Sequence, residues 1–340
     1  MSFKTLLWDQ DFWLILIATI GFGADAAAEG KLTILRIITI VAMAGIVVSY
    51  LFRKIKLQKE KRVPYLVVIG KGDSQYRDTR SQVETALADF RIHVHELKRA
   101  FGLHGEDWIF RRESQLSTDP EVWKTTITKI ENKFWRLAER IPGRKTYHFF
   151  MNGPATLAFA MGATIGSRNE YVFYHYMPAS GRNPYHDIIN FEKSDSPEGH
   201  HKLKTKIKKY KMIHASGEDK LNGMPRRDVL VALYLAGHSP VGDVTERSKQ
   251  SGLPLIVIQS KFKGTIPLDQ DWILLSQEVS SVLLDIAGRE NVERLHLFLS
   301  VPLPIAFCVG SAMGKFVRAT VYNYFPGLGG YEKVFNLEEC

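Results

Sequence analysis

The chain has 340 residues, 45% of them hydrophobic, and a formal net charge of +9. That length suits one large domain or two small ones, and its two cysteines exclude a disulfide framework. No cluster of cysteine and histidine has zinc spacing, so we expect no structural metal and no cofactor. The positive charge suits an anionic partner, although charge alone does not determine a fold.

Two apolar stretches lie near the N-terminus, at 12–22 and 32–52. As a helix, the second would span roughly 31 Å, close to the ~30 Å hydrocarbon core of a bilayer. The first reaches a similar length only if it continues through Gly23–Ala28. The alternative is a cleaved signal peptide, which requires a basic N-terminal region, and here Lys4 is balanced by nearby aspartates. We therefore predict a two-helix transmembrane hairpin.

Basic residues follow the second apolar stretch and indicate its orientation. They are Arg53, Lys54, Lys56, Lys59, Lys61 and Arg62. Because positively charged flanks stay in the cytoplasm, we expect residues 1–62 to form a two-pass hairpin with both ends on the cytoplasmic side. Binding to anionic lipid is a second interpretation of this flank. Asp25 and Arg36 would lie at similar depth, where they either pair with each other or snorkel to the nearer interface.

From Val63 the pattern is that of a globular α/β domain. Short apolar runs that end in glycine or a polar turn predict buried strands, and longer amphipathic stretches predict helices. In the first half we expect strands at 65–70, 108–110, 146–151 and 171–177, and helices at 78–100, at 119–139 and after Pro154. In the second half we expect strands at 228–235, 255–259, 294–299 and 319–325, and helices at 244–251, within 272–288 and near Pro302.

The two halves also align directly in sequence. Shifted by 148 residues, which carries His148 to His296, HFFMNGPATLAFAMGATIG lies over HLFLSVPLPIAFCVGSAMG. The identical pairs are His148/His296, Phe150/Phe298, Pro154/Pro302, Ala158/Ala306, Phe159/Phe307, Gly162/Gly310, Gly166/Gly314, Tyr174/Tyr322, Tyr176/Tyr324 and Pro178/Pro326. Convergence of two strand–helix–strand units is the alternative to duplication. We expect a first unit over 63–195, a lysine-rich connector over 196–224 and a second unit over 225–340.

Ligands of open parallel α/β sheets bind beyond the carboxyl ends of the strands, close to helix N-termini. Here those ends are short loops rich in Gly, Ser, Asn and Lys, which supply backbone amides and compact donors to phosphate. The candidate binding residues are Lys71, Asp73, Ser74, Asn152, Gly153 and Tyr176 in the first half, and His238, Ser239, Lys261, Ser300, Val301 and Tyr324 in the second. Two related halves would place these loops around one pseudo-twofold cleft, which suits a ring of nucleotides.

Several of these residues also have a structural interpretation. Tyr176 and Tyr324 could stack on bases, or pack in the core with a satisfied hydroxyl. His148 and His296 lie at strand starts, away from the loops, and we expect them to be structural. The lysines of 199–214 fit a solvated linker or an edge strand, or else face a phosphate-bearing ligand.

Catalytic motifs are missing from the sequence. The loop GKGDS lacks P-loop spacing, and no G-x-G-x-x-G follows the first strand. The nucleophile elbow G-x-S-x-G and the zinc motif H-E-x-x-H do not occur either. We therefore expect a receptor rather than an enzyme, and weak hydrolysis of the bound ligand stays open.

The stretch HLFLSVPLPIAFCVGSAMGKFVRATVYNYF closely resembles the C-terminal signature of SAVED domains. In that signature a strand ends in a small residue and a proline turn, a helix with an Ala…Gly pattern follows, and a V-Y-x-Y strand comes next. SAVED domains are described as two fused CARF-like units, and the resemblance covers 225–340 well and 63–195 more loosely. The first half departs from the signature, with Asn152-Gly153 where the second half has Ser300-Val301.

Two transmembrane helices before such a domain look like the membrane effectors of CBASS anti-phage systems. The resemblance implies two fused CARF-like, Rossmann-like units that bind a cyclic oligonucleotide, expected to be a trinucleotide, made by a phage-activated nucleotidyltransferase. It implies that binding drives self-association, clusters the anchors in the bacterial inner membrane, disrupts the lipid bilayer and aborts the infection. DNA and RNA polymers are not expected as partners. A membrane-anchored ring nuclease and a protein-binding scaffold are the alternatives.

Overall fold

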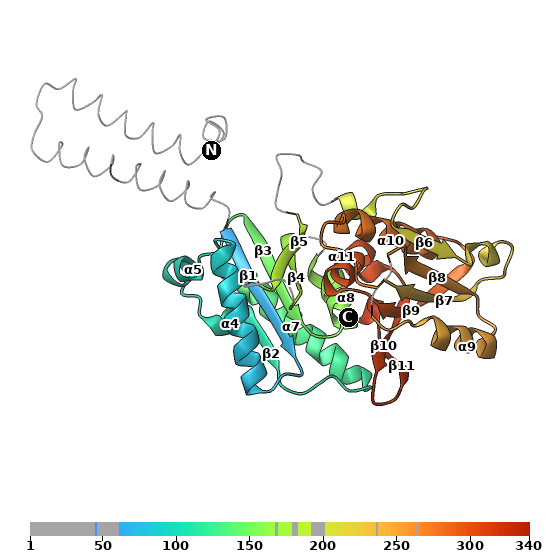
Figure 1. Ribbon diagram of the computed structural model, residues 1–340, viewed down its shortest axis with the longest axis horizontal. Coiled ribbons are helices and arrows are strands. Elements are labelled where there is room, and N and C mark those ends of the chain that lie inside the picture. Colours follow the sequence, from blue (N-terminus) through green and yellow to red (C-terminus); the bar gives the residue numbers. More distant parts are fainter. Residues whose placement is uncertain are drawn as a thin grey trace, which may run out of the picture. The chain divides into compact units, whose positions relative to one another are not determined.

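The computed structural model describes Gly45 and residues 61–166, 169–178, 183–191, 201–235, 237–262 and 264–340 (Figure 1). The chain separates into two compact units, one of residues 1–61 with 142–145 and one of residues 62–141 with 146–340. In the described part of the smaller unit, the Lys61 amide donates to the Arg144 carbonyl at 3.1 Å.

The predicted transmembrane hairpin lies outside the described residues, apart from Gly45, which is helical. Among the residues that are described, no helix combines the length and the apolar character that crossing a bilayer requires. The hairpin and the orientation that its basic flank indicates stay predictions.

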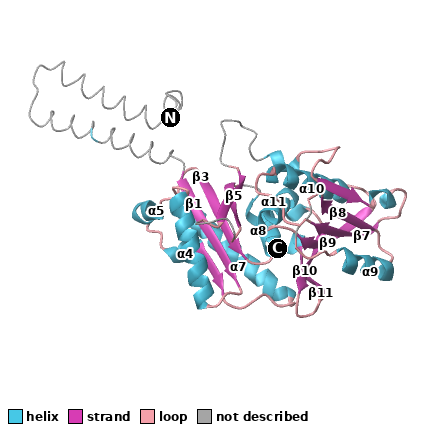
Figure 2. Cartoon of the chain, viewed as in Figure 1, coloured by secondary structure: helices cyan, strands magenta, loops and turns pink. Residues whose placement is uncertain are grey.

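The first half of the larger unit is built on a five-stranded mixed sheet (Figure 2). Its elements are β1 Lys61–Ile69, α4 Asp73–Asp89, α5 Val94–Phe101, α6 Gly105–Trp108, β2 Ile109–Arg112, α7 Pro120–Arg140, β3 Lys145–Asn152, α8 Ala155–Ile165, β4 Glu170–Tyr176 and β5 Tyr185–Asn190. The strand order is β2-β1-β3-β4-β5. β1 and β2 are parallel, as are β3 and β4, whereas β5 runs antiparallel to β4. β1 is a continuous apolar run because it is buried from Val63 to its end.

The second half contains a six-stranded sheet of order β11-β10-β9-β7-β8-β6. Its elements are η2 His201–Lys204, β6 Ile213–Ser216, η3 Glu218–Leu221, β7 Arg227–Tyr234, α9 Val241–Ser251, β8 Leu255–Ser260, α10 Trp272–Ala287, β9 Val292–Ser300, α11 Leu303–Met313, η4 Gly314–Phe316, β10 Ala319–Phe325, β11 Gly330–Asn336 and η5 Leu337–Glu339. The central pairs are parallel, and the outer strands β11 and β6 are antiparallel to their neighbours.

The two halves share one topology. When β1 is matched with β7, β2 with β8, β3 with β9, β4 with β10 and β5 with β11, both sheets have the same order, and β6 is an addition at one edge. Even an irregularity in the outer antiparallel pair recurs at the equivalent place, between Phe173 and Tyr174 and between Val321 and Tyr322. The two halves therefore have the common strand order that the predicted duplication requires.

The halves join where α8 contacts α11, two helices that are apolar and buried along most of their length. A Cβ on Gly162 would lie 1.9 Å from the carbonyl oxygen of Phe307, and a Cβ on Gly310 would lie 2.0 Å from that of Phe159. Phe159 and Phe307 are themselves equivalent, so the contact is reciprocal, like an isologous interface. Glycine is required at both positions because the backbones touch.

Each half also holds a histidine–tyrosine pair, which is buried in the first half and partly buried in the second. Nδ1 of His148 lies 2.9 Å from the hydroxyl of Tyr174, and Nδ1 of His296 lies 2.9 Å from the hydroxyl of Tyr322. Each tyrosine ring stacks on the phenylalanine two residues after that histidine, with centroids 4.3 Å and 4.2 Å apart. Burial, and secondly the charge of Arg62, lowers the pKa of His148 to about 3. These contacts agree with the structural role expected for both histidines.

The helix predicted over 78–100 is two helices. α4 ends at Asp89 and α5 begins at Val94, and between them Arg91 adopts a φ of 56°, which no continuing helix allows. The strand predicted over 108–110 starts one residue later, because Trp108 belongs to α6.

Part of the lysine-rich connector is bound to the second sheet. Its strand β6 pairs with β8 at the sheet edge, in agreement with the edge-strand interpretation. Glu278 of α10 is fully buried and accepts the backbone N–H groups of Lys211, Met212 and Ile213 at 2.6, 2.9 and 3.1 Å. A buried carboxylate is costly unless it is hydrogen-bonded, so these donors and the carboxylate stabilise one another.

Candidate ligand-binding site

In the first half, the candidate residues begin at the loop between β1 and α4. Gly70 has a φ of 69°, and a Cβ there would lie 2.7 Å from Cγ of Gln115, so the turn requires glycine. Lys71 follows in the loop, and Asp73 and Ser74 begin α4 in exposed positions. A lysine and the N-terminus of a 17-residue helix thus lie at the carboxyl end of β1, where a phosphate would be favoured.

Asp73 is paired with Arg111, a residue of β2 that was not among the predicted site residues. Its carboxylate lies 2.6 Å from Nη2 of Arg111, and the guanidinium lies over the ring of Tyr76 at 4.3 Å. The hydrogen bond to Arg111 and the charge of that side chain lower the pKa of Asp73. The Nε atoms of Arg111 and Arg112 are buried and have no hydrogen-bond partner in the described part of the chain. The sequence signal that could have identified these two arginines as site residues is their position as consecutive cations at the end of a strand.

The turn after β3 lies beside the end of β1. Asn152 is the last residue of β3, and Gly153 follows it, both half-buried. A Cβ on Gly153 would lie 3.3 Å from Cγ1 of Ile69, the last residue of β1. The loops after these two strands are therefore neighbours, as the sequence predicts.

In the second half, three loops converge in the same way. The rings of His238 and Tyr324 are stacked, with centroids 4.2 Å apart, and Tyr324 lies 5.3 Å from Tyr331 of β11. A Cβ on Gly237 would lie 3.6 Å from Oγ of Ser300. The segments after β7 and β9 and the end of β10 therefore gather at one edge.

Three other candidates of the second half serve local structure. Val301 is only 8% exposed and belongs to the core. Nζ of Lys261 donates to the carbonyl oxygen of Tyr210 in the connector at 2.7 Å. Oγ of Ser239 accepts the amide of Val241 at 3.4 Å, at the start of α9.

One hydrogen bond connects the two halves at their carboxyl edges. Thr156, in the first turn of α8, donates its hydroxyl to Oδ1 of Asn323 at 3.0 Å, next to Tyr324. The ring of His175, near the end of β4, lies 5.1 Å from the ring of Trp272 in the first turn of α10. We call the loops around these two contacts the carboxyl-edge site. The cleft predicted between the halves stays a prediction.

The two tyrosines predicted to stack on bases occupy equivalent places in this site. Tyr176 is 39% exposed and its ring lies 5.3 Å from that of Tyr185, as Tyr324 lies 5.3 Å from Tyr331. An accessible ring at the edge of an aromatic cluster is a platform on which a base can stack. The second cluster differs because the exposed ring of His238 covers Tyr324.

A further cation, from α9, lies beside the second aromatic cluster. The guanidinium carbon of Arg247 lies 5.0 Å from the ring centroid of Tyr322 and 5.5 Å from that of Phe298. Its Nη2 donates to the carbonyl oxygen of Tyr331 at 3.3 Å. Nothing in the local sequence distinguishes Arg247 from a solvated cation, so it was not predicted.

The carboxyl-edge site has the groups needed to bind an anion that carries aromatic rings. Its described residues supply aromatic faces, backbone amides and cations. Across the described part of the chain, no three His, Cys, Asp or Glu side chains come together as a metal site requires. Cys308 is fully buried, and burial raises the pKa of its thiol to about 12.

Comparison with known families finds a match for the second half. Residues 199–337 match the model of the SAVED family, the SMODS-associated and fused to various effectors sensor domain. The matched range includes the connector with Glu278's partners and every strand of the second sheet. No curated protein matches the chain.

Solved structures similar to the chain include Cap4 receptors from two bacteria. The Acinetobacter baumannii Cap4 SAVED/CARF-domain containing receptor with the cyclic trinucleotide 3'3'3'-cAAA is 12% identical with a TM-score of 0.49, and the match covers 88% of this chain and 56% of that chain. The same receptor with 2'3'3'-cAAA is 14% identical, with the same TM-score of 0.49 and coverage of 88% and 56%. The Moraxella osloensis Cap4 receptor is 14% identical with a TM-score of 0.43, covering 67% and 48%. The chain spans about half the length of these receptors.

Proposed function

We propose that the chain is a cyclic-oligonucleotide sensor and a membrane effector of anti-phage defence. The observation that carries this proposal is the match of residues 199–337 to a family of sensor domains. The shared topology extends the proposal to the first half, because the same strand order supplies the same kind of loops there. The hydrogen bond between Thr156 and Asn323 supports one composite site, since it joins the two carboxyl edges.

The ligand that we propose is a cyclic trinucleotide. Its bases would stack on Tyr176 and on the stacked pair of His238 and Tyr324. Its diester phosphates would be held by loop amides, by Lys71 and by the guanidinium of Arg111. Stacking and charge–phosphate contacts favour a ring of nucleotides over a mononucleotide, because only the ring reaches both halves at once. The chain would act by binding alone, without catalysis and without a cofactor.

The effector step that we propose takes place at the inner membrane. The apolar stretches at 12–22 and 32–52 would anchor the sensor on the cytoplasmic face. A ligand that binds the self-associated form better than the monomer shifts the population toward association, and the anchors then cluster and disrupt the bilayer. A nucleotidyltransferase would supply the ligand during infection.

Calorimetric titration of the full chain in nonionic detergent with cyclic di- and trinucleotides tests the binding step. We expect a cyclic trinucleotide to bind, and Tyr324→Ala to weaken it about tenfold or more, because one base–aromatic stack contributes about 1–3 kcal/mol. The matched control is Phe316→Ala, which removes a ring that is 90% exposed but lies outside the carboxyl-edge site. If no cyclic nucleotide binds, the receptor proposal fails and a protein-binding scaffold is favoured.

Dye release from liposomes tests the effector step. Liposomes carrying the full chain should leak only after the cognate cyclic nucleotide is added, and Tyr324→Ala should raise the concentration required. Leakage without ligand, or none with any bound ligand, contradicts the effector proposal while leaving the sensor intact. Chromatography of the ligand after the same incubation separates a receptor, which returns it unchanged, from a ring nuclease.

A further inference from the structure

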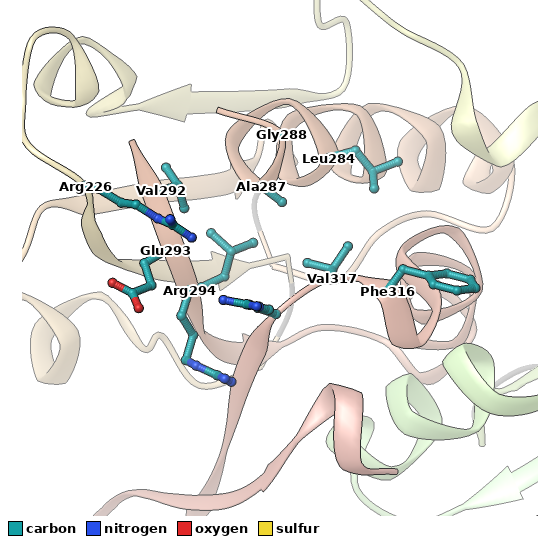
Figure 3. A pocket seen from close by; sticks show the side chains of 11 residues that line it. Arg226, Leu284, Ala287, Gly288, Val292, Glu293, Arg294, Phe316 and Val317 are labelled. Carbon is teal, nitrogen blue, oxygen red and sulfur yellow. The ribbon is translucent and has the colours of Figure 1, made fainter. Parts of the chain in front are cut away.

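A cavity of about 380 Å³ lies at the amino-terminal edge of the second sheet, away from the carboxyl-edge site (Figure 3). Its lining comes from Arg226 just before β7, from the end of α10, from the start of β9 and from the segment 316–318 before β10. A volume of this order is typical of sites for small organic molecules, roughly 300–1,000 Å³. We call it the amino-edge cavity.

Positive charge dominates the polar lining of this cavity. The charged lining residues are three arginines, Arg226, Arg294 and Arg318, and one glutamate, Glu293. The guanidinium group of Arg294 already pairs with the carboxylate of Glu338. Arg226 and Arg318 are exposed, and no carboxylate of the described residues pairs with either of them. Two guanidinium groups that share a cavity, neither of them paired with a carboxylate of the described residues, favour an anion between them.

The rest of the lining is apolar and includes an exposed ring. Leu284, Ala287, Val292, Leu295 and Val317 are the apolar lining residues, and Phe316 at the rim is 90% exposed. Figure 3 shows Leu284 and Phe316 on one side of the cavity and Arg226 and Glu293 on the other. The cavity therefore has an apolar side and a charged side, and an occupant that matches both would cover Phe316 and neutralise the arginines.

We propose that the amino-edge cavity binds an organic phosphate with an apolar body. The phosphate pairs with the guanidinium groups of Arg226 and Arg318, and the apolar body lies against Phe316 and the aliphatic side chains. An acidic phospholipid and a soluble phosphate ester share this chemistry. The proposal is independent of the sensor function, because it uses no residue of the carboxyl-edge site.

Titration of the full chain in nonionic detergent with three probes tests this proposal. The probes are hexyl phosphate, dihexanoyl phosphatidylglycerol and inorganic phosphate. We expect at least one of the first two to bind at least about tenfold more tightly than inorganic phosphate, because only they supply the apolar body. Tighter binding of the phosphatidylglycerol identifies a lipid as the source, and tighter binding of hexyl phosphate identifies a soluble ester. Equal affinity for inorganic phosphate overturns the proposal.

Substitutions of cavity residues test whether the probes bind in the amino-edge cavity. Arg318→Glu and Arg226→Glu should each weaken the preferred probe about tenfold or more, and Phe316→Ser should weaken it while leaving inorganic phosphate unaffected. The matched control is Lys129→Glu, the same charge reversal at an exposed position of α7 outside the cavity, which should change nothing. If the control weakens binding as much as the cavity variants, the phosphate is held by general surface charge and the proposal fails.

The same variants distinguish this site from the sensor site. Binding of a cyclic trinucleotide should be unaffected by Arg226→Glu and Arg318→Glu, since both side chains lie at the amino edge. Loss of trinucleotide binding in these variants would instead assign the nucleotide to the amino-edge cavity. That result would contradict the separation of the two sites.

Discussion

The two halves of the larger unit are alike where they touch each other and different where they face outward. Both contribute a glycine to the α8–α11 contact, and in both a histidine is hydrogen-bonded to a tyrosine hydroxyl. Yet His148 lies near the charge of Arg62, whereas Nε2 of His296 lies 2.8 Å from the carboxylate of Asp228. Among the residues that the structure describes, only the second half has an added edge strand and a buried carboxylate bonded to it. The difference teaches that close packing constrains a duplicated core more than it constrains its polar surroundings.

The largest effect should come from the glycine contact, where the two halves are equivalent. Gly162→Ala and Gly310→Ala should each lower the free energy of unfolding by about 3 kcal/mol or more, because the new Cβ would collide with a carbonyl oxygen that cannot move aside. Thermal melting of the full chain in detergent measures this. Gly242→Ala is the control, since a Cβ there meets nothing within 4 Å and the change should leave stability equal or higher. A loss at only one of the two positions would break the equivalence.

A smaller loss of stability should follow from Glu278→Ala, which removes a buried carboxylate of the second half. Three backbone N–H groups would lose their acceptor, and we expect about 2–3 kcal/mol of lost stability together with faster hydrogen exchange at 211–213. Glu278→Gln keeps one acceptor oxygen and should cost less. Glu139→Ala, at an exposed position of the corresponding helix α7, serves as the control. Unchanged exchange at 211–213 in Glu278→Ala would contradict the proposed role.

A pH effect should come from the first half. The pKa of His148 is about 3 in the fold and about 6.5 in the unfolded chain, so the unfolded chain binds a proton first as the pH falls. Its contribution is complete above pH ~6.5 and is lost by up to about 1.4 kcal/mol per pH unit below it. Burial and then His186 lower the pKa of His175 to about 4, which adds to the same slope.

Melting curves between pH 7 and 5 measure this slope in two variants. His148→Gln should make it shallower, because the titrating ring is gone. Tyr174→Phe removes the hydroxyl but keeps the histidine buried, so it should lower stability while leaving the slope steep. Equal slopes in all three proteins would mean that His148 does not account for the acid sensitivity.

The smallest effects should come from the helix caps, where the halves are again equivalent. Oδ1 of Asp119 accepts the amide of Glu121 at 2.9 Å, and Oδ1 of Asp271 accepts that of Leu274 at 2.8 Å. Asp119→Ala and Asp271→Ala should each cost about 1 kcal/mol in the free energy of unfolding. Replacement by asparagine, which also caps, should restore most of the loss. A cost at one helix alone would show that the two helices depend differently on their caps.

The sequence predicted best those strands and helices that are marked by apolar runs and by prolines. Strand β10 has the predicted bounds 319–325, and α8 and α11 begin directly after the prolines that marked them. Strands β5 and β11 were missed because they lie at sheet edges, where alternating exposure leaves few apolar residues, and β6 was anticipated only as one of two interpretations of the connector. The break at Arg91 was missed because the amphipathic pattern continues through it.

The sequence predicted the site only to the extent that it predicted where the strands end. The loops at Gly70, Asn152 and Ser300 lie where the α/β rule places them. The contacts of Arg111, Arg247 and Thr156 depend on which elements become neighbours in three dimensions, and no local pattern encodes that. Lys261 illustrates the converse, since it follows a strand but its ammonium group bonds the connector.

The reciprocal contact of α8 and α11 resembles a homodimer whose protomers have been joined, and the joining removes a restriction. In a homodimer every substitution appears twice, so the surface around the axis stays symmetric. In one chain the two sides can differ, and here Thr156 and Asn323 are hydrogen-bonded, whereas the equivalent positions hold Pro304 and His175. The ligand that we propose has three nucleotides, which two identical half-sites cannot share equally. An asymmetric pair of half-sites, which a single chain allows, would suit such a ligand.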